Sequence, residues 1–87
     1  MTNLEREVRD LLIQSLELDI NPDDFKEDTP LFDAENGLGL DSLEALEVVT
    51  CISANYGTQF TEDTPKEVFT SVTTLVKFIE SSKELVQ

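Results

Sequence analysis

The sequence lacks histidine and tryptophan and contains one cysteine, Cys51. Without histidine the chain cannot form a Ser-His or Cys-His nucleophile pair, and one cysteine excludes an intrachain disulfide or a cysteine-rich metal site. We interpret Cys51 as a small apolar residue of a helix. Paired carboxylates are the remaining catalytic groups, and a chain of 87 residues is too small for a large cleft. The composition therefore does not favour an enzyme.

Basic residues are also scarce. Six lysines and arginines stand against 19 acidic residues, for a net charge of −13. This balance argues against nucleic-acid binding and implies partners with basic surfaces. No lysine or arginine occurs between Lys26 and Lys66, so the acidic surface is concentrated in the middle of the chain. Self-repulsion at this charge predicts that salt or divalent cations stabilise the fold.

Long apolar runs are absent as well. The chain begins with the polar and charged segment Met1–Glu5, and nothing in it resembles a secretory signal or a membrane span. With its single cysteine, the sequence favours a reducing, cytoplasmic location. The length predicts one domain over residues 1–87. We expect a monomer that acts as a discrete protein, because the expected helices reach close to both ends.

The apolar residues of the sequence recur mostly at helical spacing, and we find no strand-like alternation. A first helix is predicted over residues 3–18, because Thr2 and Glu5 form a capping-box start. Its core stripe contains Leu4, Val8, Leu11, Leu12 and Leu16. A long loop follows, with two prolines and two glycines before Leu40. The apolar residues expected to pin this loop to the core are Phe25, Leu31, Phe32, Leu38 and Leu40.

The second half of the chain predicts three further helices. The second helix, over residues 42–56, has Asp41 as its N-cap and ends at Gly57. A short third helix over residues 65–69 begins with proline after the N-cap Thr64. Ser71 caps a fourth helix, which ends around residues 83–86. The fold class is therefore all-α.

The second helix carries apolar residues on two faces if each residue turns about 100°. One face is predicted to be core and contains Ala45, Val49, Ile52 and Tyr56. The other face combines Leu43 and Leu46 with Glu44 and Glu47. An apolar pair bordered by carboxylates suits partner docking, since apolar contact supplies affinity and the acids steer a basic partner. Packing of the two leucines beneath the loop is the alternative.

The start of the second helix contains a motif, Asp41-Ser42-Leu43, preceded by Gly39 and Leu40. The tripeptide alone is weak support for any function. Its position at the start of a helix in a short acidic chain makes it specific, and there it closely resembles the phosphopantetheine attachment site of acyl carrier proteins. The resemblance covers nearly all of the chain. It implies a four-helix bundle of acyl-carrier type, with a long loop between helices 1 and 2 and a short third helix.

In acyl carrier proteins a transferase moves 4′-phosphopantetheine from coenzyme A onto the motif serine, and acyl groups are held as thioesters on the terminal thiol. The resemblance therefore implies that Ser42 is the attachment residue and that the chain is not itself an enzyme. The implied partners are a phosphopantetheinyl transferase and an acyl synthetase, ketosynthase or acyltransferase with a basic docking surface. The surface expected to meet them is formed by Leu43, Glu44, Leu46 and Glu47.

The sequence says less about the pathway in which the protein acts and about the acyl group that it carries. Fatty-acid, polyketide and related acyl-transfer pathways all use such carriers, and the Gly37-Leu38-Gly39-Leu40 lead-in slightly favours a specialised carrier. Small adjustments between the helices are predicted to admit part of an apolar cargo to the interior. The residues expected to form this acyl pocket are Ala45, Val49, Ile52, Tyr56, Phe69, Val72 and Ile79.

Three alternatives remain at this point. A peptidyl carrier usually has Gly-Gly-x-Ser, which this chain lacks. Asp33 and Glu44 have the spacing of the first and twelfth ligands of a calcium loop, but Leu38 stands where that loop requires glycine. The strongest alternative is an acidic helical adaptor without a prosthetic group. Coexpression with a phosphopantetheinyl transferase distinguishes it, because only a carrier gains the mass of one pantetheine arm.

Overall fold

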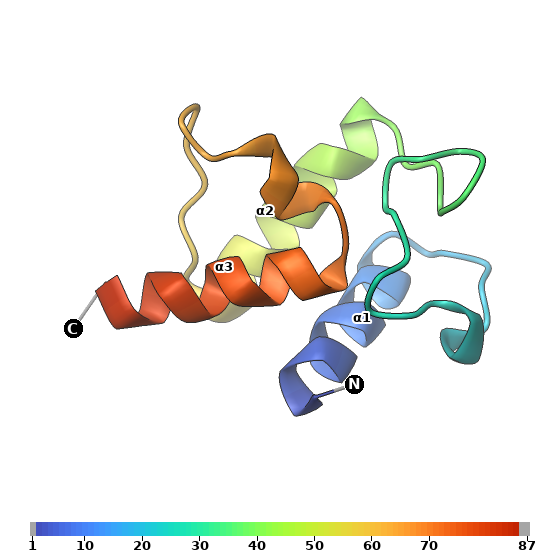
Figure 1. Cartoon of the computed structure of the whole chain (residues 1–87), viewed down its shortest axis with the longest axis horizontal. Coiled ribbons are helices and arrows are strands. Elements are labelled where there is room, and N and C mark those ends of the chain that lie inside the picture. The colour runs from blue at the N-terminus through green and yellow to red at the C-terminus, as the bar shows by residue number, and fades with distance from the viewer. Residues whose placement is uncertain (1, 86–87) are drawn as a thin grey trace.

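The computed structural model describes the backbone of residues 2–85 and the side chains of residues 2–81. Within this range the regular elements are three α-helices and two 3₁₀ helices: α1 (Asn3–Ser15), η1 (Pro22–Asp24), α2 (Ser42–Tyr56), η2 (Lys66–Phe69) and α3 (Val72–Leu85). The first helix, α1, packs against both α2 and α3 (Figure 1). The all-α prediction is confirmed for the described residues.

The predicted four-helix bundle is not confirmed, because the short third helix is the 3₁₀ helix η2. Pro65 is its N-cap in extended conformation and not its first helical residue. The Val68 N–H donates to the Pro65 carbonyl at 3.1 Å and the Thr70 N–H to the Glu67 carbonyl at 3.2 Å. Both bonds span three residues, which is the 3₁₀ pattern, and the segment is too short to become a regular α-helix.

The first helix is shorter than predicted. It begins at Asn3 with the expected capping box between Thr2 and Glu5, but it ends at Ser15 and not at Leu18. Glu17 adopts a left-handed conformation with φ of 52°. The Leu18 N–H then donates to the Ile13 carbonyl at 3.0 Å, which closes the helix end.

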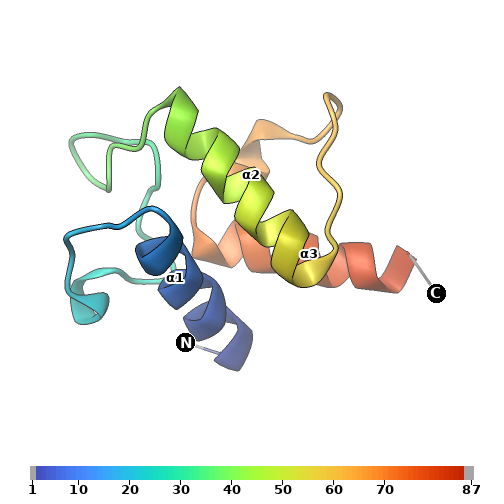
Figure 2. The same ribbon diagram turned by 180° about the vertical axis from the view of Figure 1, so that it is seen from behind.

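The core lies between the three α-helices and the inner side of the long loop. Its buried apolar residues are Val8, Leu12, Phe25, Leu31, Leu40, Val48, Ile52, Val72, Leu75, Val76 and Ile79. The loop lies at one side of the molecule, while α3 extends toward the opposite side (Figures 1 and 2). Phe25, Leu31 and Leu40 therefore pin the loop as predicted.

One predicted core position, Phe32, is wrong, and the predicted core face of α2 is shifted. Phe32 was expected to pin the loop, but its side chain is 37% exposed. On α2 the buried residues are Val48 and Ile52, which lie one turn apart, while Val49 is only partly buried. The centre of the buried face of α2 is therefore rotated by roughly 50°, about half a residue, from the predicted face, and Ile52 belongs to both. Ala45 and Tyr56 lie at its margins and are also partly buried.

Within residues 2–85, every helix is too short or too polar to cross a lipid bilayer.

Candidate functional site

The start of α2 is held by reciprocal hydrogen bonds around Asp41. The Asp41 carboxylate accepts from the Glu44 N–H at 2.9 Å, and the Glu44 carboxylate accepts from the Asp41 N–H at 3.2 Å. This is the predicted capping box, and it makes Ser42 the first residue of the helix. The cap fixes the backbone at Ser42 and so the direction in which its side chain points.

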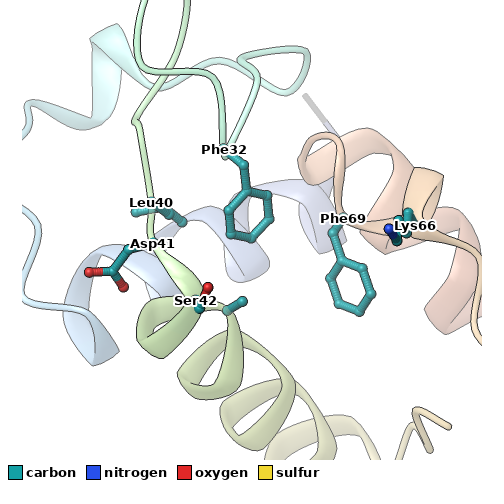
Figure 3. A pocket seen from close by; sticks show the side chains of 7 residues that line it. Phe32, Leu40, Asp41, Ser42, Lys66 and Phe69 are labelled. Atoms are coloured by element: carbon teal, nitrogen blue, oxygen red, sulfur yellow. The ribbon is translucent and has the colours of Figure 1, made fainter. Parts of the chain in front are cut away.

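Ser42 lies at the edge of an open groove of about 430 Å³ (Figure 3). Its side chain is exposed, and within the described part of the chain its hydroxyl has no hydrogen-bond partner. Figure 3 shows the hydroxyl on the side of the Phe32 and Phe69 rings, while the Asp41 carboxylate points away from them. The serine oxygen is therefore accessible from solvent and is not used to stabilise the fold.

The groove is mostly apolar, and its residues come from three separate segments. The loop supplies Phe32, Leu40 and Asp41, the first turns of α2 supply Ser42 and Ala45, and η2 supplies Lys66 and Phe69. The Leu31 N–H donates to the Thr70 carbonyl at 2.9 Å. Leu31 directly precedes Phe32 and Thr70 directly follows Phe69, so this bond joins the two segments that carry the phenylalanines.

Backbone hydrogen bonds shape the loop that carries Phe32. The Leu38 N–H donates to the Pro30 carbonyl and the Leu40 N–H to the Leu31 carbonyl, both at 3.0 Å. Gly37 lies so close to the Pro30 carbonyl that a Cβ at this position would overlap the oxygen. The loop can therefore close around Gly37 only because that residue has no side chain.

Asp33 belongs to the same loop, and its carboxylate accepts hydrogen bonds from the residues of the turn that follows it. Its carboxylate accepts from the Asn36 side chain at 3.1 Å and from the Glu35 N–H at 2.9 Å. These hydrogen bonds, with that of the Asn36 side chain the largest, lower the pKa of the Asp33 carboxyl. Among the described side chains, no group of three or more potential metal ligands lies together.

The leucines predicted to meet partners are at the surface. Leu43 is 73% exposed and Leu46 is 64% exposed. They are not packed beneath the loop, so that alternative is wrong. Glu47 is exposed beside them, whereas Glu44 is partly buried and engaged in the capping box. The large apolar side chains found exposed among the described residues are these two leucines and Phe32.

The residues predicted to form an acyl pocket do not share one cavity. Ala45 and Phe69 line the groove beside Ser42. Tyr56 instead lines a separate surface pocket with α1, where burial and then the Glu7 carboxylate raise the pKa of its hydroxyl. The remaining residues of the set, Val49, Ile52, Val72 and Ile79, are partly or fully buried.

Neither Phe32, which was predicted to pin the loop to the core, nor Lys66 was assigned to a binding site from the sequence. In the sequence, an exposed phenylalanine of a loop such as Phe32 cannot be distinguished from one that packs into the core. Lys66 has one recognisable signal, since it is the first cation after a long acidic interval. Its side chain is exposed and makes no ion pair with any residue that the structure describes.

Comparison with known protein families identifies the class of this domain. A family model described as phosphopantetheine attachment site matches residues 6–79, and the chain therefore belongs to that family. Proteins of this family are carriers to which 4′-phosphopantetheine is covalently attached. Searches of curated proteins and of solved structures each found no match to the chain.

The groove and its serine fit this prosthetic group. Attachment requires a hydroxyl that is reachable by a second protein and free of internal hydrogen bonds, and Ser42 meets both conditions. Phosphopantetheine is a flexible arm with apolar and amide segments, and the surface next to Ser42 offers apolar side chains and one ammonium group. Bound there, the arm would supply a terminal thiol.

Proposed function

We propose that Ser42 receives 4′-phosphopantetheine and that the protein carries acyl groups as thioesters between enzymes of a fatty-acid, polyketide or related acyl-transfer pathway. The observation that carries this proposal is the exposed, unpartnered Ser42 hydroxyl at the first residue of α2, within a chain of this family. Asp41 supports it by holding the start of the helix, and Leu43 completes the motif.

The chain does not activate its own serine. Transfer forms a bond between Ser42 Oγ and the phosphorus that bears the pantetheine arm, and it breaks the bond from that phosphorus to the nucleotide part of coenzyme A. The hydroxyl proton must pass to a base. The sequence has no histidine, so the phosphopantetheinyl transferase supplies the base and the metal ion.

The recognition surface we propose consists of Leu43, Glu44, Leu46 and Glu47. Its support is the exposure of both leucines on the helix that presents Ser42, together with the excess of acids there. A carrier has to bind and leave several enzymes in turn. A small apolar patch with steering charges suits such brief contacts, because association is fast and the buried area is small. The partners would be the transferase and a basic acyl synthetase, ketosynthase or acyltransferase, met by a cytoplasmic monomer.

The attachment is tested by intact-mass measurement after incubation with a purified phosphopantetheinyl transferase and coenzyme A. The wild-type protein should gain one arm, and Ser42→Ala should gain none while keeping its far-ultraviolet circular dichroism. Ser53→Ala is the matched control, because the Ser53 hydroxyl donates to the Thr58 carbonyl at 2.7 Å and is already engaged. An arm found on Ser15, Ser53 or Ser71, or no arm at all, would refute the assignment. The last result would favour the acidic adaptor.

We also propose that small adjustments between the helices admit part of an apolar acyl cargo to the interior. Support comes from Ala45 and Phe69, which line the groove, and from Ile52, Val72 and Ile79 of the same predicted set, which are buried in the core. Amide shifts of Ile52, Val72 and Ile79 should then differ between the bare pantetheine form and a medium-chain acyl form. Unchanged shifts would mean that the cargo stays outside the helices.

A further inference from the structure

Among the described residues that line the groove beside Ser42, Lys66 is the one with a positive charge. It comes from η2 and lies beyond the Phe69 ring as seen from Ser42 (Figure 3). Between Lys26 and Lys77 the sequence has ten acidic residues and a single basic residue, which is Lys66. The acidic middle of the chain therefore places its one positive charge at the groove that holds the proposed attachment serine.

The side chain of Lys66 makes no described hydrogen bond or ion pair that would stabilise the fold. It is exposed, and no carboxylate of the described residues pairs with it. The ion pair that is found among those residues joins Arg9 to Asp10 on α1. A lysine offers three hydrogen-bond donors and no acceptor, so its complement is an oxygen, and a carboxylate above all. The ammonium group is therefore available to a molecule that covers the groove.

An enzyme that acts at Ser42 comes close enough to meet Lys66. Even a small protein–protein interface of roughly 600 Å² on each partner extends about 14 Å from its centre. Both residues line a groove of about 430 Å³, and a sphere of that volume is only about 9 Å across. An interface centred on Ser42 is therefore wide enough to include the Lys66 side chain.

The sign of the charge differs between the two sides of Ser42. On α2, Glu47 is an exposed carboxylate within two turns of the serine. On η2, the groove presents the Lys66 ammonium group. A uniformly basic partner surface is attracted on the α2 side and repelled on the η2 side, because like charges that meet across an interface disfavour the complex.

We propose that Lys66 is a specificity-determining residue for the enzymes that act at Ser42, an inference that rests on the proposed attachment there. Lys66 disfavours enzymes whose basic docking surface extends over η2. The partner that fits has basic residues opposite the acidic face of α2 and a carboxylate opposite η2, so that both sides attract. Because Lys66 is exposed, this discrimination acts mainly on the association rate and weakens as salt is added.

The test measures kcat/KM for transfer of 4′-phosphopantetheine to the full chain, at low and at physiological salt, by a phosphopantetheinyl transferase chosen for a uniformly basic docking surface. Lys66→Glu should raise kcat/KM about two- to fivefold at low salt, and the gain should shrink as salt is added. Lys66→Arg keeps the charge and should match the wild type. Lys77→Glu is the matched control, since Lys77 is an exposed lysine of α3 outside the groove and its reversal changes the net charge equally.

Charge reversal on the enzyme tests the stated chemistry of the partner. The basic residues of the transferase surface are replaced by glutamate one at a time, and each variant is assayed with the wild-type chain and with Lys66→Glu. At one position the replacement should make the wild-type chain the better substrate, which reverses the preference of the unaltered enzyme. Such a double-mutant cycle isolates the contact of the two side chains. If no position couples to Lys66, its assigned role is wrong.

The outcomes separate this inference from the proposed function. If the arm is attached to Ser42 but Lys66→Glu and Lys77→Glu change kcat/KM equally, or Lys66→Glu reacts more slowly than the wild type, the inference is wrong and the carrier function stands. If no arm is attached to the wild-type chain, both proposals fail. Should Lys66→Glu lose its helical circular dichroism, Lys66→Gln decides the question, because it removes the charge and should still react faster than Lys77→Gln.

Discussion

Replacing Asp41 by alanine tests whether the capping box, and not merely its charge, presents Ser42. The change removes the carboxylate that accepts from the Glu44 N–H at 2.9 Å and leaves that donor without its partner. Loss of an N-cap side chain costs about 1 kcal/mol of stability. For a domain of this size, 1 kcal/mol lowers the melting temperature by about 4–8 °C. Thermal unfolding of the unmodified protein, followed by far-ultraviolet circular dichroism, measures this shift.

Asp41→Asn separates the cap from the charge, because asparagine caps helices about as well as aspartate does. It should melt close to the wild type. If the transferase modifies Asp41→Asn at nearly the wild-type rate and Asp41→Ala more slowly, the residue acts by positioning Ser42. Equal slowing in both variants would assign the effect to the charge. An unchanged melting temperature in Asp41→Ala would refute the reasoning, since the cap would then contribute nothing.

Three further predictions concern charge, packing and pH. Glu47→Lys should slow association with the transferase and flatten its salt dependence in stopped-flow measurements, whereas Glu80→Lys on α3 should have little effect; equal losses would mean that net charge governs recognition. Gly37→Ala should lower the free energy of unfolding in urea by about 1–3 kcal/mol, because its Cβ overlaps the Pro30 carbonyl, and unchanged stability would contradict this packing. The stabilisation from Asp33 is fully present above its ordinary pKa of 3.8 and is lost as pH falls through its lowered folded pKa. Asp33→Asn should therefore flatten the acid limb of the stability curve, and an identical limb in both proteins would rule this out.

Helix starts were predictable from the sequence because their signals are local. Thr2 with Glu5 and Asp41 with Glu44 lie three residues apart, and both pairs form the expected capping boxes. Helix ends were less predictable. The end of α1 depends on Glu17 adopting a left-handed conformation. Glycine or asparagine usually occupies such a position, so a glutamate there gives no signal that the helix ends.

The groove could not be predicted, because it depends on contacts between distant segments. Phe32 and Phe69 line one groove, and the hydrogen bond from the Leu31 N–H to the Thr70 carbonyl joins the two segments that carry them. A second long-range bond, from the Thr73 N–H to the Glu27 carbonyl at 3.0 Å, ties the loop to α3. Sequence periodicity describes one element at a time and carries no information on such pairs. The prediction that Phe32 lies in the core followed from its apolar character alone.

The shift between the predicted and the buried face of α2 has a different cause, which is connected with the docking surface proposed for Leu43 and Leu46. An ordinary surface helix shows one apolar stripe, from which the buried face can be found. On α2, Val48 and Ile52 are buried while Leu43 and Leu46 remain exposed on another side. Apolar residues that serve an interface thus resemble core residues in the sequence and blur the stripe. A helix whose apolar pattern does not resolve into one face is therefore a place to look for a docking surface, and in this chain that helix begins with Ser42.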